Sequence, residues 1–224
     1  MRIVFVRHGE PNYEKDCLTE RGHEQAKIAA ERLRNEDITE IYASPLGRAM
    51  ETAGYTSELL GLPIKKLDFM EEIYWALGDG PLYGPGHPWM TVDEMALKGI
   101  DLNRPDWRES PFFKTNRVLE CVDRIDKGID EWLESLGYVR NGFYYDHKTE
   151  EKEHRTVALF SHGGSSSVAM GHILNLPFPY VCGLLHIDFT GITVLRMSRR
   201  KGPITLPCME LANDVRHLKE KNLL

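Results

Sequence analysis

The chain opens with Arg2-Ile3-Val4-Phe5-Val6-Arg7-His8-Gly9, and this stretch decides the fold. Its apolar residues run without interruption and are rich in branched side chains, which is typical of a strand buried on both faces. A second run, Thr156-Val157-Ala158-Leu159-Phe160, has the same character and leads into Ser161-His162-Gly163-Gly164. The two runs predict core strands of a mainly parallel sheet, each ending in a histidine and a glycine.

Helices and strands alternate outward from the first strand. We expect a helix after Thr19, its N-cap, then a strand at 38–43, a helix to about Leu60 and a strand at 64–67. Ser44 and Pro45 are expected as the cap and the first residue of the second helix. The order strand, helix, strand, helix, strand predicts an α/β fold: a three-layer sandwich with a mainly parallel central sheet and helices on both faces.

The second half of the chain carries one strongly periodic helix, over residues 115–136. Asn141-Gly142 predicts a hairpin at 138–145, and a helix is expected from the glycines at 163–164 to about Leu174. Residues 184–197 are expected to form a closing hairpin that turns near Thr190-Gly191. The tail from Pro207 is expected to be mixed helix and coil.

Residues 73–115 are interpreted as a cap or lid inserted into a single domain that spans 1–224. Residues 78–88 are rich in glycine and proline and predict a loop, and 89–114 are expected to be irregular. Four aromatic or basic side chains of this insertion either line a pocket mouth or pack the insertion onto the sheet: Trp75, Tyr83, His87 and Trp89.

Composition excludes several classes of protein. The 224 residues include 42% hydrophobic and 28% charged residues, so the chain is neither disordered nor fibrous. A net charge of −6 argues against a nucleic-acid partner. No apolar run is long enough for a membrane span or a signal peptide. The four cysteines are scattered, as in a protein of the reducing cytoplasm, where we expect this chain to reside. The sequence permits a homodimer without requiring one.

The two histidines are predicted to share one site. Ligands of open α/β sheets bind beyond the carboxyl ends of the strands, and neighbouring strands lie only about 5 Å apart. Arg7 adjoins His8, and Arg48 follows a strand–helix junction whose N–H groups favour anions. Guanidinium groups match the oxygens of a phosphoryl group. Two imidazoles, two guanidiniums and a helix N-terminus therefore predict an oxyanion pocket.

The same residues carry a resemblance to a known family. Four motifs occur in order: Arg7-His8-Gly9-Glu10, Leu18-Thr19-Glu20-Arg21-Gly22, Ser44-Pro45-Leu46-Gly47-Arg48-Ala49-Met50-Glu51-Thr52-Ala53 and Ser161-His162-Gly163-Gly164. The chain resembles the histidine phosphatase superfamily, also called phosphoglycerate-mutase-like, over residues 1 to about 175. The segment Asn213–Leu218 is also similar to common endings in that family.

The resemblance implies a role for each matching residue. His8 matches the nucleophile that becomes phosphohistidine, and Arg7, Arg48 and His162 match the residues that hold the phosphoryl oxygens. Gly163 is expected to let the substrate approach the backbone. Relatives often carry an asparagine where this chain has Glu14, and Asn12 is a candidate substitute for it in substrate binding.

The family's proton donor falls in Phe69-Met70-Glu71-Glu72-Ile73. When Met70 is aligned with the family leucine, Glu72 takes the donor position. A shift of one residue would give that position to Glu71 instead.

The predicted activity is that of a metal-independent phosphomonoester hydrolase, which acts through phosphohistidine on a small phosphorylated metabolite. The sequence contains no HExxH motif, no EF-hand loop and no zinc-like cysteine spacing, so no metal or other cofactor is expected. Two alternatives remain: a phosphotransferase of the phosphoglycerate mutase type and a non-catalytic phosphate-binding module. The short segment Glu10–Leu18 and the lack of a basic, proline-rich substrate element favour the hydrolase over the mutase.

Overall fold

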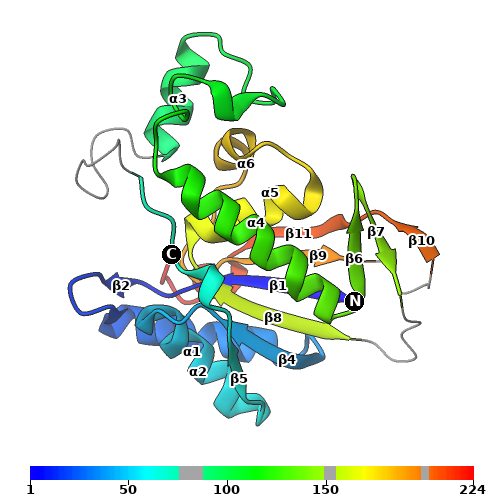
Figure 1. Ribbon diagram of the computed structural model, residues 1–224. Coiled ribbons are helices and arrows are strands. Elements are labelled where there is room, and N and C mark those ends of the chain that lie inside the picture. The colour runs from blue at the N-terminus through cyan, green and yellow to red at the C-terminus, as the bar shows by residue number, and fades with distance from the viewer. Residues whose placement is uncertain (76–87, 149–154, 198–201) are drawn as a thin grey trace.

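The computed structural model describes residues 1–75, 88–148, 155–197 and 202–224. Its central sheet, within these residues, has six strands in the order β11-β9-β1-β8-β4-β5 (Figure 1). β1, β8, β4 and β5 run parallel, whereas β9 pairs antiparallel with both β1 and β11. The strands are β1 (Arg2–Arg7), β4 (Ile38–Ala43), β5 (Ile64–Lys66), β8 (Thr156–Ser161), β9 (Ile192–Arg196) and β11 (Cys208–Asp214).

Helices cover both faces of this sheet, which confirms the predicted α/β sandwich. The helices α1 (Glu20–Leu33) and α2 (Gly47–Leu60) lie below the sheet in Figure 1, and α4 (Val118–Ser135) and α5 (Gly163–Leu174) lie above it. Alternate residues of β1 pack on opposite faces of the sheet. Val4 and Val6 pack toward α1 and α2, whereas Ile3 and Phe5 pack in the core with α4 and α5. A strand buried on both faces needs such an unbroken apolar run.

The first two helices begin differently. The Thr19 hydroxyl accepts a hydrogen bond from the Gly22 N–H at 3.0 Å and caps α1 as predicted. The prediction that Ser44 caps the second helix and that Pro45 is its first residue was wrong, because α2 begins at Gly47, after both residues. The chain is still extended at Leu46, which precedes the helix and supplies no side-chain cap.

Long-range pairing overturns two expectations for the C-terminal part. Residues 184–197 do not form a hairpin: they begin at the end of α6 (Phe178–Leu184) and finish with β9, which pairs with β1 and β11. The Thr190 N–H donates to the Arg7 carbonyl at 3.0 Å, so this segment crosses the end of β1. The tail forms β11, because β9 offers it an open sheet edge, followed by the short helix α7 (Arg216–Lys219).

The hairpin at Asn141-Gly142 is confirmed. The strands β6 (Tyr138–Asn141) and β7 (Tyr144–His147) pair antiparallel, and Gly142 has a φ of +61°, a value that favours glycine. The strand β10 (Gly202–Thr205) adds to β7. Two further strands, β2 (Pro11–Asn12) and β3 (Cys17–Leu18), form a small hairpin before α1.

The inserted segment contains more regular structure than its sequence predicts. A helix, α3 (Pro88–Leu97), packs against α6 at the top of Figure 1, and the short 3-10 helices are η1 (Asp68–Met70) and η2 (Trp107–Glu109). Trp75 is buried, and its ring meets that of Phe113 edge-on at 5.5 Å, so it packs the insertion onto the domain. Tyr83, His87, the loop before residue 88 and the side chain of Trp89 lie outside the described residues.

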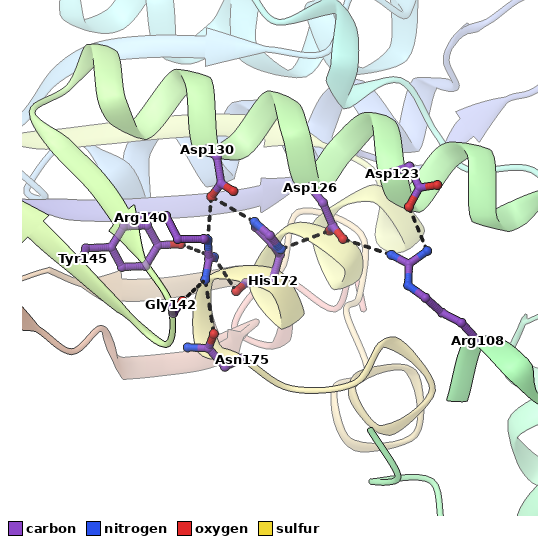
Figure 2. A network of polar contacts seen from close by, with 9 residues as sticks. All are labelled: Arg108, Asp123, Asp126, Asp130, Arg140, Gly142, Tyr145, His172 and Asn175. Carbon is purple, nitrogen blue, oxygen red and sulfur yellow. Dashed lines mark hydrogen bonds and ion pairs between the residues drawn. The ribbon is translucent and has the colours of Figure 1, made fainter. Parts of the chain in front are cut away.

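A charged network joins the insertion to α4, α5 and the β6–β7 hairpin (Figure 2). The imidazole of His172 on α5 lies between two carboxylates of α4, with its Nδ1 3.4 Å from Asp126 and its Nε2 2.9 Å from Asp130. Arg108 of η2 bonds to Asp126 at 3.2 Å, and Arg140 of β6 bonds to Asp130 at 2.8 Å. The network therefore fixes α5 against its neighbours.

All four cysteines are free thiols. Among the described helices, none combines the length and the apolarity that crossing a bilayer would take.

Candidate active site

The register of β1 and β8 brings His8 and His162 together. Arg7 pairs with Ser161 across the two parallel strands, and each histidine follows one residue later. The His8 N–H donates to the Ser161 carbonyl at 2.9 Å, and the two ring centroids lie 5.2 Å apart. Both side chains are buried. The predicted meeting of the two imidazoles at one sheet edge is confirmed.

The hydrogen bonds of His8 fix its tautomer. Its Nδ1 lies 2.7 Å from the Gly9 carbonyl oxygen, which can only accept, so Nδ1 carries the proton. Nε2 then holds a lone pair, toward which Arg48 Nε donates at 3.3 Å. Burial lowers the pKa of His8 to about 3, with the charges of Arg7 and Arg48 acting in the same direction, although the Gly9 hydrogen bond opposes them. The imidazole is therefore neutral, which is the nucleophilic form.

The two arginines reach this edge from different elements. Arg48 lies in the first turn of α2 and is buried. Arg7 ends β1, and its Nη1 donates to the Ile187 carbonyl at 2.5 Å while its guanidinium lies 4.3 Å from the centroid of the Phe189 ring. Arg7 Nε is buried and has no hydrogen-bond partner among the described residues. A buried donor of this kind suits an oxygen of a bound anion.

His162 offers a second such group. Its Nε2 lies 2.8 Å from the Ser44 hydroxyl, and its Nδ1 is buried and lacks a partner in the described parts of the chain. Burial lowers the pKa of His162 well below its usual value, and His8, Arg48 and Arg7 add to the effect. Ser44, expected as a helix cap, thus orients His162 instead.

The geometry distinguishes Glu72 from Glu71. The Glu72 carboxylate accepts hydrogen bonds from the N–H groups of Ser165 at 2.9 Å and Gly164 at 3.3 Å, at the start of the helix that follows His162. Burial raises the pKa of Glu72, against the opposing effects of these N–H groups and of Arg7. Glu71 is exposed and lies 4.0 Å from Arg124. Of the two, Glu72 is the carboxyl group that contacts the start of the helix following His162.

Two other predicted site residues, Gly163 and Asn12, occupy different positions. Gly163 opens α5 and is buried beside His162. Asn12 belongs to the β2–β3 hairpin, where its side-chain oxygen accepts from the Lys15 N–H at 3.2 Å. That oxygen therefore serves the turn of the hairpin, and Glu14 is exposed.

Sequence reasoning missed Asp16. Its carboxylate pairs with Arg48 and also accepts from the Gly47 N–H at 2.6 Å. The N-terminus of α2, which we expected to favour an external anion, thus already holds one from the protein itself. The short segment Glu10–Leu18 was the available sequence signal for Asp16. This segment forms the β2–β3 hairpin and lies against α2.

The C-terminal segment braces the end of β1. The Thr190 hydroxyl lies 3.1 Å from Nε2 of His217, and the Asn213 side-chain oxygen accepts from the Asp188 N–H at 3.0 Å. These contacts hold the 188–190 segment, whose Thr190 N–H bonds to Arg7. Within the described ranges, no group of three or more His, Cys, Asp or Glu side chains is arranged to hold a metal ion.

Comparisons with known proteins agree with this geometry. The sequence profile of the histidine phosphatase superfamily (branch 1) matches residues 3–207. The chain is 36% identical over 188 residues to a protein of Photorhabdus laumondii named "Probable phosphoglycerate mutase GpmB", covering 79% of this chain and 76% of that protein. It is 22% identical over 212 residues to the "Putative phosphoserine phosphatase 2" of Hydrogenobacter thermophilus, covering 91% and 93% of the two chains.

A solved structure has the same fold. The mycobacterial glucosyl-3-phosphoglycerate phosphatase, in complex with VO3, superposes with a TM-score of 0.65 and 22% identity over 95% of this chain and 98% of its own. The profile match covers most of the chain, and the four quoted motifs lie within it. This chain therefore belongs to the histidine phosphatase superfamily, branch 1.

Proposed function

We propose that the protein is a metal-independent phosphomonoester hydrolase that acts through a phosphohistidine at Nε2 of His8, on a small phosphorylated metabolite. One observation carries the proposal. A buried, neutral imidazole presents a lone pair beside the guanidinium of Arg48, and the buried nitrogens of Arg7 and His162 have no hydrogen-bond partner among the described residues. A tetrahedral phosphoryl group satisfies all of these groups at once.

In the first step, Nε2 of His8 attacks phosphorus and the P–O ester bond breaks. The electron pair of that bond goes to the ester oxygen, which takes the proton of Glu72 and leaves as an alcohol. Arg7, Arg48 and His162 stabilise the charge on the oxygens in transfer. The Gly9 carbonyl accepts from Nδ1–H, which supports the positive charge that the ring acquires.

In the second step, the Glu72 carboxylate takes a proton from water as the water oxygen attacks phosphorus. The P–N bond breaks and its electron pair returns to Nε2, so inorganic phosphate, neutral His8 and protonated Glu72 result. Burial raises the pKa of Glu72, which favours the acid form that the first step needs more than exposure to solvent would.

A second candidate is a mutase-type phosphotransferase, which the name of the Photorhabdus relative favours. The two reactions share the first step and differ in the acceptor of the phosphoryl group, which is water in one and a hydroxyl in the other. Product analysis by 31P NMR separates them, because the hydrolase releases inorganic phosphate and the transferase yields an isomeric phosphoester.

The test is hydrolysis of p-nitrophenyl phosphate and a panel of sugar, nucleotide and amino-acid phosphates in EDTA. We expect turnover by the wild type, a base-stable phosphoenzyme in rapid quench, and loss of both in His8→Ala. His23→Ala is the matched control, because His23 contacts Tyr55 away from the site. Wild-type rates in His8→Ala would refute the proposed nucleophile, and phosphate binding without turnover would support a non-catalytic module.

A further inference from the structure

The β2–β3 hairpin, residues 11–18, lies against the start of α2. Two carboxylates make the polar contacts between them. Glu51 on α2 accepts from the Leu18 N–H at 2.6 Å, and Asp16 in the hairpin accepts from the Gly47 N–H at 2.6 Å. The two residues therefore anchor the same hairpin to the same helix, Glu51 from the helix and Asp16 from the hairpin.

Asp16 differs from Glu51 because its second oxygen continues to the site. Oδ2 binds the Gly47 N–H, while Oδ1 pairs with Nη1 of Arg48. The backbone at Asp16 is left-handed, with a φ of +49°, and its carbonyl lies so close to Gly47 that a Cβ there would be 2.1 Å away. The backbone of Asp16 and the backbone of Gly47 therefore both fix the position of the Asp16 carboxylate.

The contact fixes the direction of the Arg48 guanidinium. Nη1 is held by Asp16 and Nε donates to Nε2 of His8 at 3.3 Å, which leaves Nη2 for an oxygen of the phosphoryl group. The ring of Tyr13, from the same hairpin, lies 5.5 Å from the guanidinium carbon. When the Nε2 lone pair of His8 bonds to phosphorus, the contact with Arg48 Nε is lost, and the Asp16 contact still holds the planar guanidinium beside His8.

We propose that Asp16 is a positioning residue of the reaction: its carboxylate links the N-terminus of α2 to Arg48 and holds that arginine in the orientation that stabilises phosphoryl transfer at His8. The inference rests on the proposed function. It assigns Asp16 an effect that passes through Arg48, because among the described residues Arg48 is the proposed catalytic group that Asp16 contacts.

Two other roles for Asp16 predict different results. If Asp16 only anchored the hairpin, its replacement would act like that of Glu51 and would not depend on Arg48. If its carboxylate competed with substrate for Arg48, its removal would tighten phosphate binding and leave kcat unchanged or raise it. Positioning predicts a lower kcat instead, because the oriented guanidinium contributes mainly in the transition state.

The experiment is a double-mutant cycle on the full chain with Asp16→Asn, Arg48→Ala and the combined variant, and with Glu51→Gln as the matched control. Asparagine keeps one acceptor but sets an NH2 group against either Gly47 N–H or Arg48. We measure kcat and KM for p-nitrophenyl phosphate, and the affinity for inorganic phosphate by calorimetry, with thermal unfolding of each variant. We expect Asp16→Asn to lower kcat by about 10- to 100-fold, the range typical of a displaced catalytic group, with a much smaller change in KM.

In the Arg48→Ala background, we expect the Asp16 substitution to change kcat by less than about twofold, because its effect requires the arginine. We expect Glu51→Gln to retain wild-type kcat. An equal loss in both backgrounds, an equal loss in Glu51→Gln, or an unchanged or raised kcat in Asp16→Asn would each overturn the inference. These outcomes leave the proposed function intact, whereas a wild type that neither binds phosphate nor turns over the ester would refute that function first.

Discussion

The carboxylate of Glu72 accepts a hydrogen bond from the backbone N–H of Ser165 at 2.9 Å, within the first turn of the helix that His162 precedes. The candidate proton donor and the imidazole that would bind the phosphoryl group thus depend on the start of one helix. A Cβ at Gly164 would lie 2.7 Å from Oε1 of Glu72, so the glycine allows this approach. The relationship leads to a prediction about the leaving group.

Replacing Glu72 with Gln should lower the rate most for substrates with poor leaving groups. An alkoxide needs a proton as it departs, whereas p-nitrophenolate leaves without one. We expect the rate of phosphoenzyme formation from an alkyl phosphate such as glycerol phosphate to fall by about 10²–10⁴-fold, the usual contribution of general acid catalysis, with a clearly smaller loss for p-nitrophenyl phosphate. Rapid-quench rates of phosphoenzyme formation from both esters provide the measurement, because the second step, in which Glu72 acts as the base, is the same for both. Glu71→Gln is the control, and equal losses on the two esters in Glu72→Gln would contradict the role of the acid.

The pH profile of kcat should reflect the lowered pKa of His8 and the raised pKa of Glu72. Burial lowers the pKa of His8 to about 3, so the neutral nucleophile persists as pH falls below the ordinary histidine value of about 6.5. Burial also raises the pKa of Glu72, so its acid form is lost only as pH rises through that raised value. We expect kcat for an alkyl phosphate to hold on the acid side down to about pH 5 and to decline as pH rises through the raised pKa of Glu72.

Glu72→Gln should remove that alkaline decline, because glutamine does not titrate. A kcat profile that falls on the acid side with a midpoint near the ordinary histidine value would show that His8 titrates normally in the complex, and the argument from burial would be wrong.

Two helical glycines should respond in opposite ways to alanine. A Cβ at Gly22 in α1 would lie 2.1 Å from the Glu10 carbonyl oxygen, whereas a Cβ at Gly54 in α2 would have no atom of the described residues within 4 Å. We expect Gly22→Ala to lower the free energy of unfolding by about 1–3 kcal/mol, since backbone must move. Gly54→Ala should raise it by about 0.5–1 kcal/mol through helix propensity. Urea unfolding measures both, and equal effects would contradict the packing described.

The network of Figure 2 should stabilise the fold in a pH-dependent way. Burial acts to raise the pKa of Asp130, but hydrogen bonds from His172 and Arg140 outweigh it and lower that pKa. A lowered pKa contributes stability above the unfolded value of about 3.9, and the contribution is lost as pH falls through the folded value. Arg140→Met should therefore cost about 2–3 kcal/mol near pH 7 and less near pH 3.

Chemical unfolding at the two pH values measures this difference. Arg104→Met is the control, because Arg104 pairs with Asp106 at an exposed position and should leave the unfolding free energy unchanged. A cost for Arg140→Met that is the same at both pH values would mean that the ionisation of Asp130 is not involved.

The sequence predicts those parts of the molecule whose signals are local. The apolar runs of β1 and β8 mark the core strands, and the histidines that follow them fall at one sheet edge because parallel strands end together. The position of Asp16 is different, since it depends on how a short hairpin folds across the start of α2. The pairing of β9 with β11 is also non-local: the branched residues of β9 indicate a strand without indicating its partners, and β11 carries no strong strand pattern of its own.

The register between β1 and β8 makes anion affinity a reporter of folding. The groups proposed to bind phosphate come from the ends of two strands and from α2, and the two strands stand far apart in the sequence. An unfolded chain cannot assemble them, so inorganic phosphate at about a hundred times its dissociation constant should add about 2.7 kcal/mol to the native state. A shift of the melting temperature with phosphate concentration would then identify correctly paired strands even in variants that no longer turn over substrate.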